Sequence, residues 1–200
     1  ALNLAAAYAS GVALGFDEHD VFDALASAPG VPGRFETVRA ENGVLGVVDY
    51  AHSPDALDNV LATAREIVPP GGRLTVVFGC GGDRDRTKRP EMARVAEARA
   101  DRVVLTSDNP RTEAPAAILD EVRAGLSRPD AAAVVVDRAE AIALAVAEAS
   151  PGDVVVVAGK GHETYQVVGT ERRHFDDREA LRDAFAAVPV TDASSERETA

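Results

Sequence analysis

Four short segments of this chain carry charged and amide groups of the kinds that bind small charged ligands. Each segment comes directly after a run of β-branched and aliphatic residues, and the four cover residues 49–52, 79–85, 107–111 and 159–163. They read Asp-Tyr-Ala-His, Gly-Cys-Gly-Gly-Asp-Arg-Asp, Ser-Asp-Asn-Pro-Arg and Gly-Lys-Gly-His-Glu. Forked guanidinium donors beside carboxylates suit a ligand that carries both signs of charge. The segments therefore predict a site for an amino acid with a second charged end.

Four buried strands, which would hold these segments in place, are predicted from the apolar runs before them. The runs are Val44 to Asp49, Arg73 to Phe78, Arg102 to Thr106 and Val154 to Ala158. Each is typical of a fully buried strand, and each is followed by a helical pattern, which indicates βαβ units and a parallel sheet. Parallel strands place their carboxyl ends at one edge, where open α/β sheets bind ligands. We therefore expect the four segments to converge.

The predicted fold class is α/β, a Rossmann-like, mostly parallel sheet flanked by helices, with an antiparallel edge hairpin. Asn42-Gly43, after a short strand at Glu36 to Ala40, is a strong hairpin signal. A further strand at Val134 to Val136 and a second hairpin, Gln166–Val168 to Arg172–His174, are expected to complete the sheet. The expected helices are Pro54 to Val68, Pro90 to Ala100, Ala114 to Leu126, Arg138 to Ala149 and Asp177 to Ala187.

The ends of the chain differ in character from its middle. A helical pattern at Ala1 to Leu14 has no start signal, and a second helical pattern at Asp20 to Ser27 is followed by the Pro/Gly-rich stretch at residues 29–33, which is typical of a linker. We therefore expect residues 1–32 to be the last helices of an upstream domain, so that the chain begins inside a larger protein. Residues 33–188 are expected to form one domain. The polar residues 189–200 are expected to be disordered.

The composition excludes several function classes. Acidic residues outnumber basic ones by 33 to 21, which argues against nucleic acid as a partner. The chain of 200 residues has one cysteine, Cys80, and so no internal disulfide. The small Cys80 side chain is expected to pack at a strand end. Without a signal-peptide pattern or an apolar run of spanning length, the expected location is cytoplasmic, away from membranes.

The sequence matches two familiar nucleotide-binding motifs only in part. Residues 79–84 resemble a dinucleotide fingerprint, but Arg84 stands where the third glycine is needed for close helix packing. Gly159-Lys160 resembles part of a Walker A loop, but the earlier glycine and the Ser/Thr that would hold magnesium are missing. The residues therefore disfavour a nicotinamide-dependent oxidoreductase and provide no phosphate cradle.

The hydrogen-bond donors and acceptors of these side chains suggest a ligand-binding role for each residue, and each residue could instead have a structural role. Arg84 and Arg111 suit a carboxylate, although they could instead pair with Asp83, Asp85 or Glu113. The remaining candidates are acceptors for an ammonium group, Asp108 and Glu163, and amide or backbone groups, Asn109 and Gly159. Asp108 and Asn109 could also form an Asx turn or a helix cap, and His162 and Glu163 a solvated turn.

Five motifs together resemble the Mur ligase family in their order and spacing. They are residues 33–36, 49–56, 78–85 with 88–90, 108–111 and 158–163. The sequence is most similar to members that add 2,6-diaminopimelate to UDP-N-acetylmuramoyl-L-alanyl-D-glutamate in peptidoglycan synthesis. The resemblance implies an ATP-dependent, Mg²⁺-requiring ligase in which an acyl phosphate is attacked by the diaminopimelate amine.

The resemblance also implies roles for particular residues. The diaminopimelate contacts would be Arg84, Asp108, Asn109, Pro110, Arg111, Gly159 and Glu163. The ATP contacts would be Arg34, Asp49 and His52. Arg111 favours diaminopimelate, because lysine-adding members change this arginine. Neither a catalytic nucleophile nor a metal ligand is implied for this chain.

The resemblance is to the carboxy-terminal domain of the family and to the end of its central domain. The UDP-sugar domain, the Walker A loop, the magnesium ligands and a modified lysine of the complete enzymes are missing from this sequence. We therefore expect the isolated chain to be inactive as a ligase. The alternatives are a non-catalytic Rossmann-like module that binds an amino acid or a nucleotide, and a related ligase that adds lysine or extends folates. Arg111 disfavours the lysine-adding ligase, and the rest of its turn disfavours the folate-extending one.

Overall fold

The computed structural model describes residues 2–188, which form two compact units with the chain boundary between Val31 and Pro32. In the first unit, helices α1 (Leu2–Ala13) and α2 (Glu18–Ser27) pack against each other. Helix α2 begins two residues earlier than predicted because the Asp17 carboxylate accepts hydrogen bonds from the backbone N–H groups of His19 and Asp20. The predicted tail, residues 189–200, lies outside the described residues.

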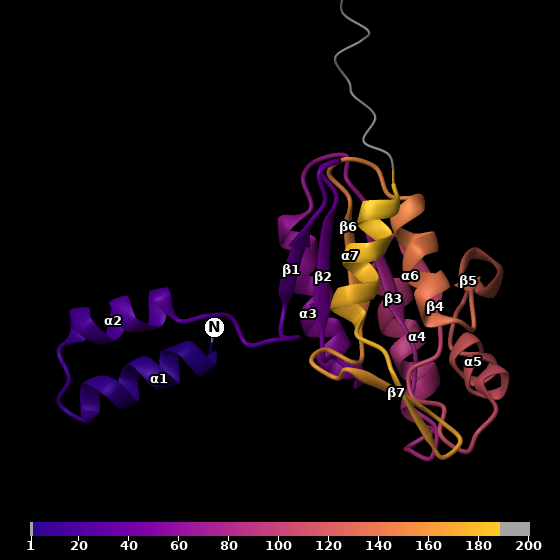
Figure 1. Ribbon diagram of the computed structural model, residues 1–200, viewed down its shortest axis with the longest axis horizontal. Helices are drawn as coiled ribbons and strands as arrows, with labels where there is room; N and C mark the ends of the chain where they lie inside the picture. Colours follow the sequence, from indigo (N-terminus) through magenta and orange to yellow (C-terminus); the bar gives the residue numbers. More distant parts are fainter. Residues whose placement is uncertain (1, 189–200) are drawn as a thin grey trace, which may run out of the picture. The chain divides into compact units, whose positions relative to one another are not determined.

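The second unit is built on a six-stranded sheet in the order β1-β2-β6-β3-β4-β5 (Figure 1). All neighbours are parallel except β1 and β2, which form an antiparallel pair at the sheet edge. The strands are β1 (Glu36–Arg39), β2 (Leu45–Asp49), β3 (Leu74–Phe78), β4 (Arg102–Leu105), β5 (Ala133–Val134) and β6 (Val154–Ala158). The predicted fold class is confirmed, and so is the hairpin at Asn42-Gly43, where Gly43 has a φ of +84°.

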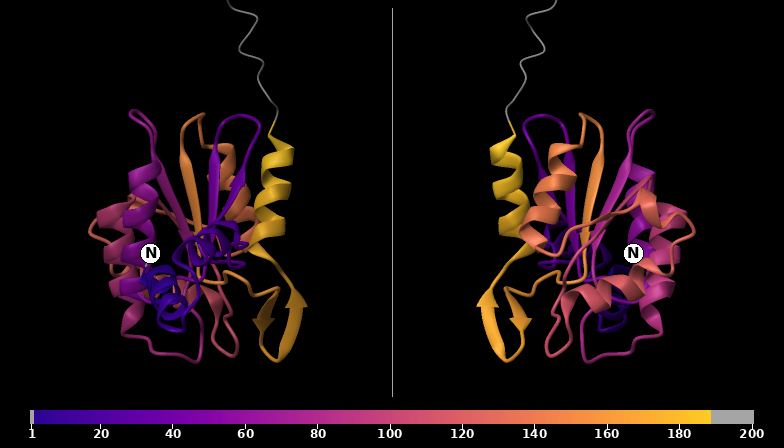
Figure 2. Two further views of the ribbon diagram at one scale, coloured as in Figure 1. Left: turned by 90° about the vertical axis from the view of Figure 1, so that its left-hand side faces the viewer. Right: turned by 90° about the vertical axis from the view of Figure 1, so that its right-hand side faces the viewer.

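Helices cover both faces of this sheet (Figure 2). On one face, α3 (Pro54–Ile67), α4 (Lys88–Arg99) and α5 (Pro115–Arg123) pack on side chains such as Val76 and Phe78. On the other face, α6 (Arg138–Ala147) and α7 (Asp177–Ala187) pack on the alternate residues, such as Val77. Because both faces are covered, β3 and β6 are buried along their whole length, and this explains their unbroken apolar sequences. None of the helices within residues 2–188 is long and apolar enough to cross a bilayer.

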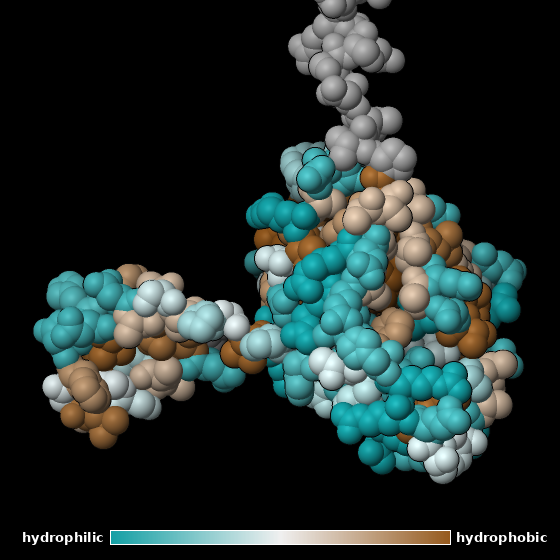
Figure 3. Space-filling model, viewed as in Figure 1, coloured by the Kyte–Doolittle hydropathy of each residue, from teal (hydrophilic) through white to brown (hydrophobic). Residues whose placement is uncertain are grey.

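The second predicted hairpin forms, but its expected place in the sheet is wrong. Strands β7 (Tyr165–Val168) and β8 (Glu171–His174) make a separate two-stranded sheet. The edges of the main sheet are taken by β1 and β5, and β7 instead forms a parallel bridge between Val168 and Arg111 in the turn after β4. The outer strand β8 is fully exposed, and Figure 3 shows a hydrophilic surface over this hairpin.

Candidate functional site

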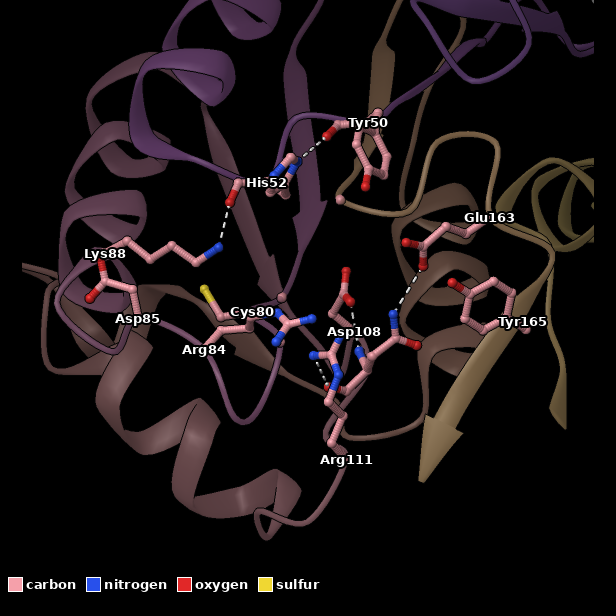
Figure 4. Close-up of a pocket in the computed structure, with 14 residues that line it drawn as sticks. Tyr50, His52, Cys80, Arg84, Asp85, Lys88, Asp108, Arg111, Glu163 and Tyr165 are labelled. Carbon is pink, nitrogen blue, oxygen red and sulfur yellow. Dashed lines mark hydrogen bonds between the residues drawn. The ribbon is translucent and has the colours of Figure 1, made fainter. Parts of the chain in front are cut away.

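The turns after β2, β3, β4 and β6 surround one cavity of about 370 Å³ (Figure 4). The predicted convergence of the four segments is therefore confirmed. The residues that line the cavity are Tyr50, His52, Gly79, Cys80, Gly81, Arg84, Asp85, Lys88, Asp108, Asn109, Arg111, Gly159, Glu163 and Tyr165. Of the predicted diaminopimelate contacts, only Pro110 does not line this cavity.

Two guanidinium groups reach the cavity without a carboxylate partner. Arg84 donates to the carbonyl of Asp83 (3.3 Å) and Arg111 to the carbonyl of Gly82 (2.8 Å). Within residues 2–188 neither arginine forms a salt bridge. Figure 4 shows both side chains pointing toward the middle of the cavity, where Asp108 lies.

The plainer alternative for these arginines, pairing with neighbouring acids, does not occur because those acids are engaged elsewhere. Asp83 accepts hydrogen bonds from the hydroxyl and backbone N–H of Thr112, and Asp85 from those of Thr87. Glu113 pairs with Arg89 at 2.7 Å. The Arg84 and Arg111 guanidinium groups are therefore available to an anionic group of a ligand.

Buried Arg89, which was not among the predicted site residues, joins the second turn to the third. Its guanidinium donates to both oxygens of Glu113, to Glu121 and to the carbonyl of Gly81. Glu113 in turn accepts the backbone N–H of Asp83 at 2.6 Å. The hydrogen bond from Arg89, with that from Asp83, lowers the pKa of Glu113 to about 2. This network fixes the loop that carries Arg84.

The third and fourth turns are joined through a lysine that the sequence interpretation did not select. The Lys160 Nζ lies 3.2 Å from Asn109 Oδ1 and 3.3 Å from Glu163 Oε2, and the side chain is fully buried. The Asn109 amide nitrogen also donates to Glu163 at 2.9 Å. Glu163 is thus held at the cavity wall rather than in a solvated turn. One signal in the sequence was available, because Lys160 comes two residues after the end of a fully buried strand.

Asp108 presents its carboxylate to the cavity. Its Oδ1 accepts the backbone N–H of Asn109 at 2.6 Å, and it caps no helix. Gly159, with a φ of +120°, passes so close that a Cβ there would lie 2.7 Å from Asp108 Oδ2. Glycine therefore allows the fourth turn to approach this carboxylate.

The three residues predicted to face ATP lie around Tyr50 at the end of β2. The Arg34 guanidinium lies 4.8 Å from the centre of the Tyr50 ring, and the His52 ring centre lies 4.7 Å from it. The Asp49 oxygens accept the backbone N–H groups of Phe35 and Ala51, both at 2.8 Å. Only His52 of the three lines the cavity.

Gly33, near the start of the second unit, packs against the fourth turn. A Cβ on Gly33 would overlap the backbone of Gly161 and His162, and a Cβ on Gly161 would lie 2.6 Å from the Tyr50 Cβ. Both glycines have positive φ, +65° and +52°. The fourth turn therefore meets the start of the second unit at Gly33 and meets the first turn at Gly161.

Cys80 packs as expected for a small residue at a strand end. It is 3% exposed, and its Sγ lies 3.7 Å from the Met92 Sδ. Burial raises the pKa of the Cys80 thiol to about 12. Cys80 is therefore a neutral wall of the cavity and not a nucleophile.

Potential metal-binding side chains do not gather in the described part of the chain. No group of three or more His, Cys, Asp or Glu side chains within residues 2–188 is arranged to hold a metal ion.

Comparison with known families and curated proteins gives consistent matches. Residues 33–161 match the family described as Mur ligase, glutamate ligase domain. The chain is 54% identical over 185 residues to UDP-N-acetylmuramoyl-L-alanyl-D-glutamate–2,6-diaminopimelate ligase from Thermosynechococcus vestitus, with 92% of this chain and 37% of the relative covered. The enzyme of the same name from Leptospira borgpetersenii is 50% identical over 186 residues, with 92% and 37% covered. The chain thus spans a little over a third of these relatives' length.

Solved structures match the fold over the same region. A structure of UDP-N-acetylmuramoyl-L-alanyl-D-glutamate–2,6-diaminopimelate ligase superposes with a TM-score of 0.73 at 45% identity, covering 92% of this chain and 38% of that one. The UDP-N-acetylmuramate-alanine ligase MurC from Thermotoga maritima shares the fold at a TM-score of 0.64 and 24% identity, with 92% and 36% covered.

Proposed function

The chain belongs to the Mur ligase family, and we propose that it forms the amino-acid-binding part of an ATP-dependent ligase. The proposed reaction adds 2,6-diaminopimelate to UDP-N-acetylmuramoyl-L-alanyl-D-glutamate, the activity named for the relatives. In this proposal residues 1–32 belong to a preceding ATP-binding domain and its linker, and residues 33–188 form the amino-acid-binding domain.

The observation that carries the proposal is the pair of arginines in the cavity. Arg84 and Arg111 have no carboxylate partner within the described residues, and they face a wall that also carries Asp108 and Glu163. Diaminopimelate has an ammonium and a carboxylate at each end, so its distal carboxylate matches the arginines and its distal ammonium matches the acids. Lysine lacks the distal carboxylate and would leave the two guanidinium groups without a partner.

The contribution of this domain to the reaction is to position the incoming amino acid. Positioning of two reactants can supply on the order of 7 to 11 kcal/mol of the barrier when the geometry is good. Cys80 is neutral and buried, so no thiolate is available for covalent catalysis. The domain would therefore hold the amine in place for attack on an acyl phosphate formed elsewhere in the ligase.

On the nucleotide side, we assign Arg34 and His52 to ATP contact and Asp49 to the ribose. The arrangement of Arg34 and His52 around the Tyr50 ring supports a shared surface at the end of β2. Each Asp49 oxygen accepts one backbone N–H and keeps a lone pair for a hydroxyl. Mg²⁺ would be held by ATP and by the ligase domain that binds its phosphates.

The test is substrate competition in the complete ligase. We expect diaminopimelate to be preferred over lysine by about 10⁴ or more in kcat/KM, because a site built around a polar partner rejects an analogue that lacks it. Arg111→Ala should weaken diaminopimelate use by roughly 1.5 to 3 kcal/mol while the KM for ATP stays nearly constant.

The matched control is Arg86→Ala, because Arg86 lies in the same loop as Arg84 but pairs with Glu121 and does not line the cavity. It should leave both KM values unchanged. Comparable use of lysine by the unmutated enzyme would contradict the assignment of the two arginines to the distal carboxylate.

A further inference from the structure

The β7–β8 hairpin packs on the turn that carries Arg111, a residue that the proposed function assigns to substrate binding. We propose that β7 is a specificity-determining element that fixes the direction of the Arg111 guanidinium, and that Gln166 is a positioning residue that anchors β7 to this turn. The inference rests on the proposed function, in which Arg111 binds the distal carboxylate of diaminopimelate.

Hydrogen bonds from the hairpin hold Arg111 on both sides of its Cα. The Arg111 backbone N–H donates to the carbonyl of Val167 at 3.0 Å, and the Gly169 N–H donates to the carbonyl of Arg111 at 2.7 Å. Arg111 has a φ of +52°, in the left-handed region that non-glycine residues seldom adopt. Such a conformation persists only where the surroundings hold it. The hairpin supplies that restraint.

The hairpin also fixes the two residues that precede this turn's proline. The Gln166 side-chain amide donates to the carbonyl of Asp108 at 2.7 Å, and the Val167 N–H donates to Asn109 Oδ1 at 2.9 Å. Gln166 is the hairpin's only side chain in these contacts, because the other bonds use its backbone. A substitution at Gln166 can therefore loosen the docking while the strand pairing of β7 with β8 is kept.

The direction of the guanidinium follows from this backbone. In the docked conformation Arg111 reaches the carbonyl of Gly82, at 2.8 Å, and so spans from the third turn to the second. If β7 detached, Arg111 would relax toward negative φ and its guanidinium would leave that position. The larger loss should fall on a ligand with a distal carboxylate, because a ligand without one lacks the group that Arg111 binds.

The chain offers a matched control on the same rung of the hairpin. Gln166 is paired in register with Arg173 on β8, and the only hydrogen bonds of the Arg173 side chain within residues 2–188 go to Glu171 on the same exposed strand. Gln166→Met and Arg173→Met therefore place the same side chain at two paired positions, one on β7 and one on β8. Methionine is close to glutamine in size but has no amide donor.

The experiment is an NMR titration of this chain and both variants with 2,6-diaminopimelate and, separately, with lysine. We expect Gln166→Met to raise the Kd for diaminopimelate about tenfold, as the loss of one hydrogen bond predicts, and to raise the Kd for lysine by a smaller factor, because lysine lacks the carboxylate that Arg111 binds. Amide hydrogen exchange at Arg111 and Gly169 should become faster in Gln166→Met alone. Arg173→Met should behave like the unmutated chain.

The outcomes separate this inference from the proposed function. Equal weakening of both ligands by Gln166→Met, or no weakening of either, would overturn the positioning role while the unmutated chain still prefers diaminopimelate. An unmutated chain that binds the two amino acids equally would overturn the proposed function itself. In that case the exchange rates at Arg111 still report whether Gln166 anchors the hairpin.

Discussion

Arg138 and Asp177 form a bidentate ion pair, with N–O distances of 2.7 and 2.8 Å, and both side chains are fully buried. The same guanidinium donates to the carbonyls of Ser107 and Ala158, at 3.2 and 3.0 Å. These carbonyls directly precede Asp108 and Gly159. One arginine at the start of α6 therefore connects the third and fourth turns, across the end of β3, with the start of α7.

Removal of one partner of this pair should destabilise the domain strongly. Arg138→Met leaves the Asp177 carboxylate buried without a cation, and we expect a loss of about 3 to 5 kcal/mol in the free energy of unfolding. The double variant Arg138→Met with Asp177→Leu should recover part of this loss, because it removes both charges of the pair. Urea denaturation measures both, with the exposed Arg182→Met as a control expected to lose less than about 1 kcal/mol. A loss from Arg138→Met as small as that control would contradict this account.

Glu113 should make the domain sensitive to acid. Its pKa is lowered from 4.5 to about 2 by the hydrogen bond from Arg89 and then by that from the Asp83 backbone. A carboxyl group with a lowered folded-state pKa stabilises the fold above its unfolded pKa, and this stabilisation is lost as the pH falls from about 4.5 toward 2. We expect Glu113→Gln to flatten the stability profile in this range, as measured by urea denaturation at a series of pH values. An unchanged slope would show that other carboxyl groups dominate.

Gly159→Ala tests the close approach of the fourth turn to Asp108. The new methyl group would lie 2.7 Å from Asp108 Oδ2, in a backbone with a φ of +120°. We expect diaminopimelate binding to be lost along with about 1 to 3 kcal/mol of stability. Gly71→Ala is the control, since Gly71 also has a positive φ, +86°, but nothing lies within 4 Å of its Cβ position. If both variants bind diaminopimelate equally well, contact with Asp108 is not what requires glycine at 159.

The Cys80 thiol should be inert toward alkylating reagents in the folded chain. Its pKa of about 12, raised from 9.0 by burial, lowers the thiolate fraction at pH 8 by about three powers of ten. We expect iodoacetamide to modify Cys80 at least that much more slowly in the native chain than in urea, as mass spectrometry can follow. Fast modification without denaturant would mean that the cavity wall opens around Cys80.

The strands and the converging turns could be predicted because their signals are local. Val154 to Ala158 is apolar throughout because both faces of β6 are covered, and Asn42-Gly43 specifies its own turn. The place of the β7–β8 hairpin could not be predicted, because it is decided by contacts with a turn more than fifty residues earlier. The burial of Arg138 and Lys160 could not be predicted from the sequence for the same reason. Charged residues are expected at the surface, and only distant partners such as Asp177 and Asn109 make their burial possible.

Gly33 and Gly161 are far apart in the chain but in contact in the structure, so the two positions together indicate whether a sequence can form this contact. Neither position has room for a side chain, because each would collide with backbone atoms or with Tyr50. A sequence that keeps the apolar strands and the Asp-Asn-Pro-Arg turn but carries a larger residue at either position cannot close this contact. The residues at the two positions, taken together, therefore separate uncharacterised sequences that can pack the start of this domain against the fourth turn from those that must place it differently.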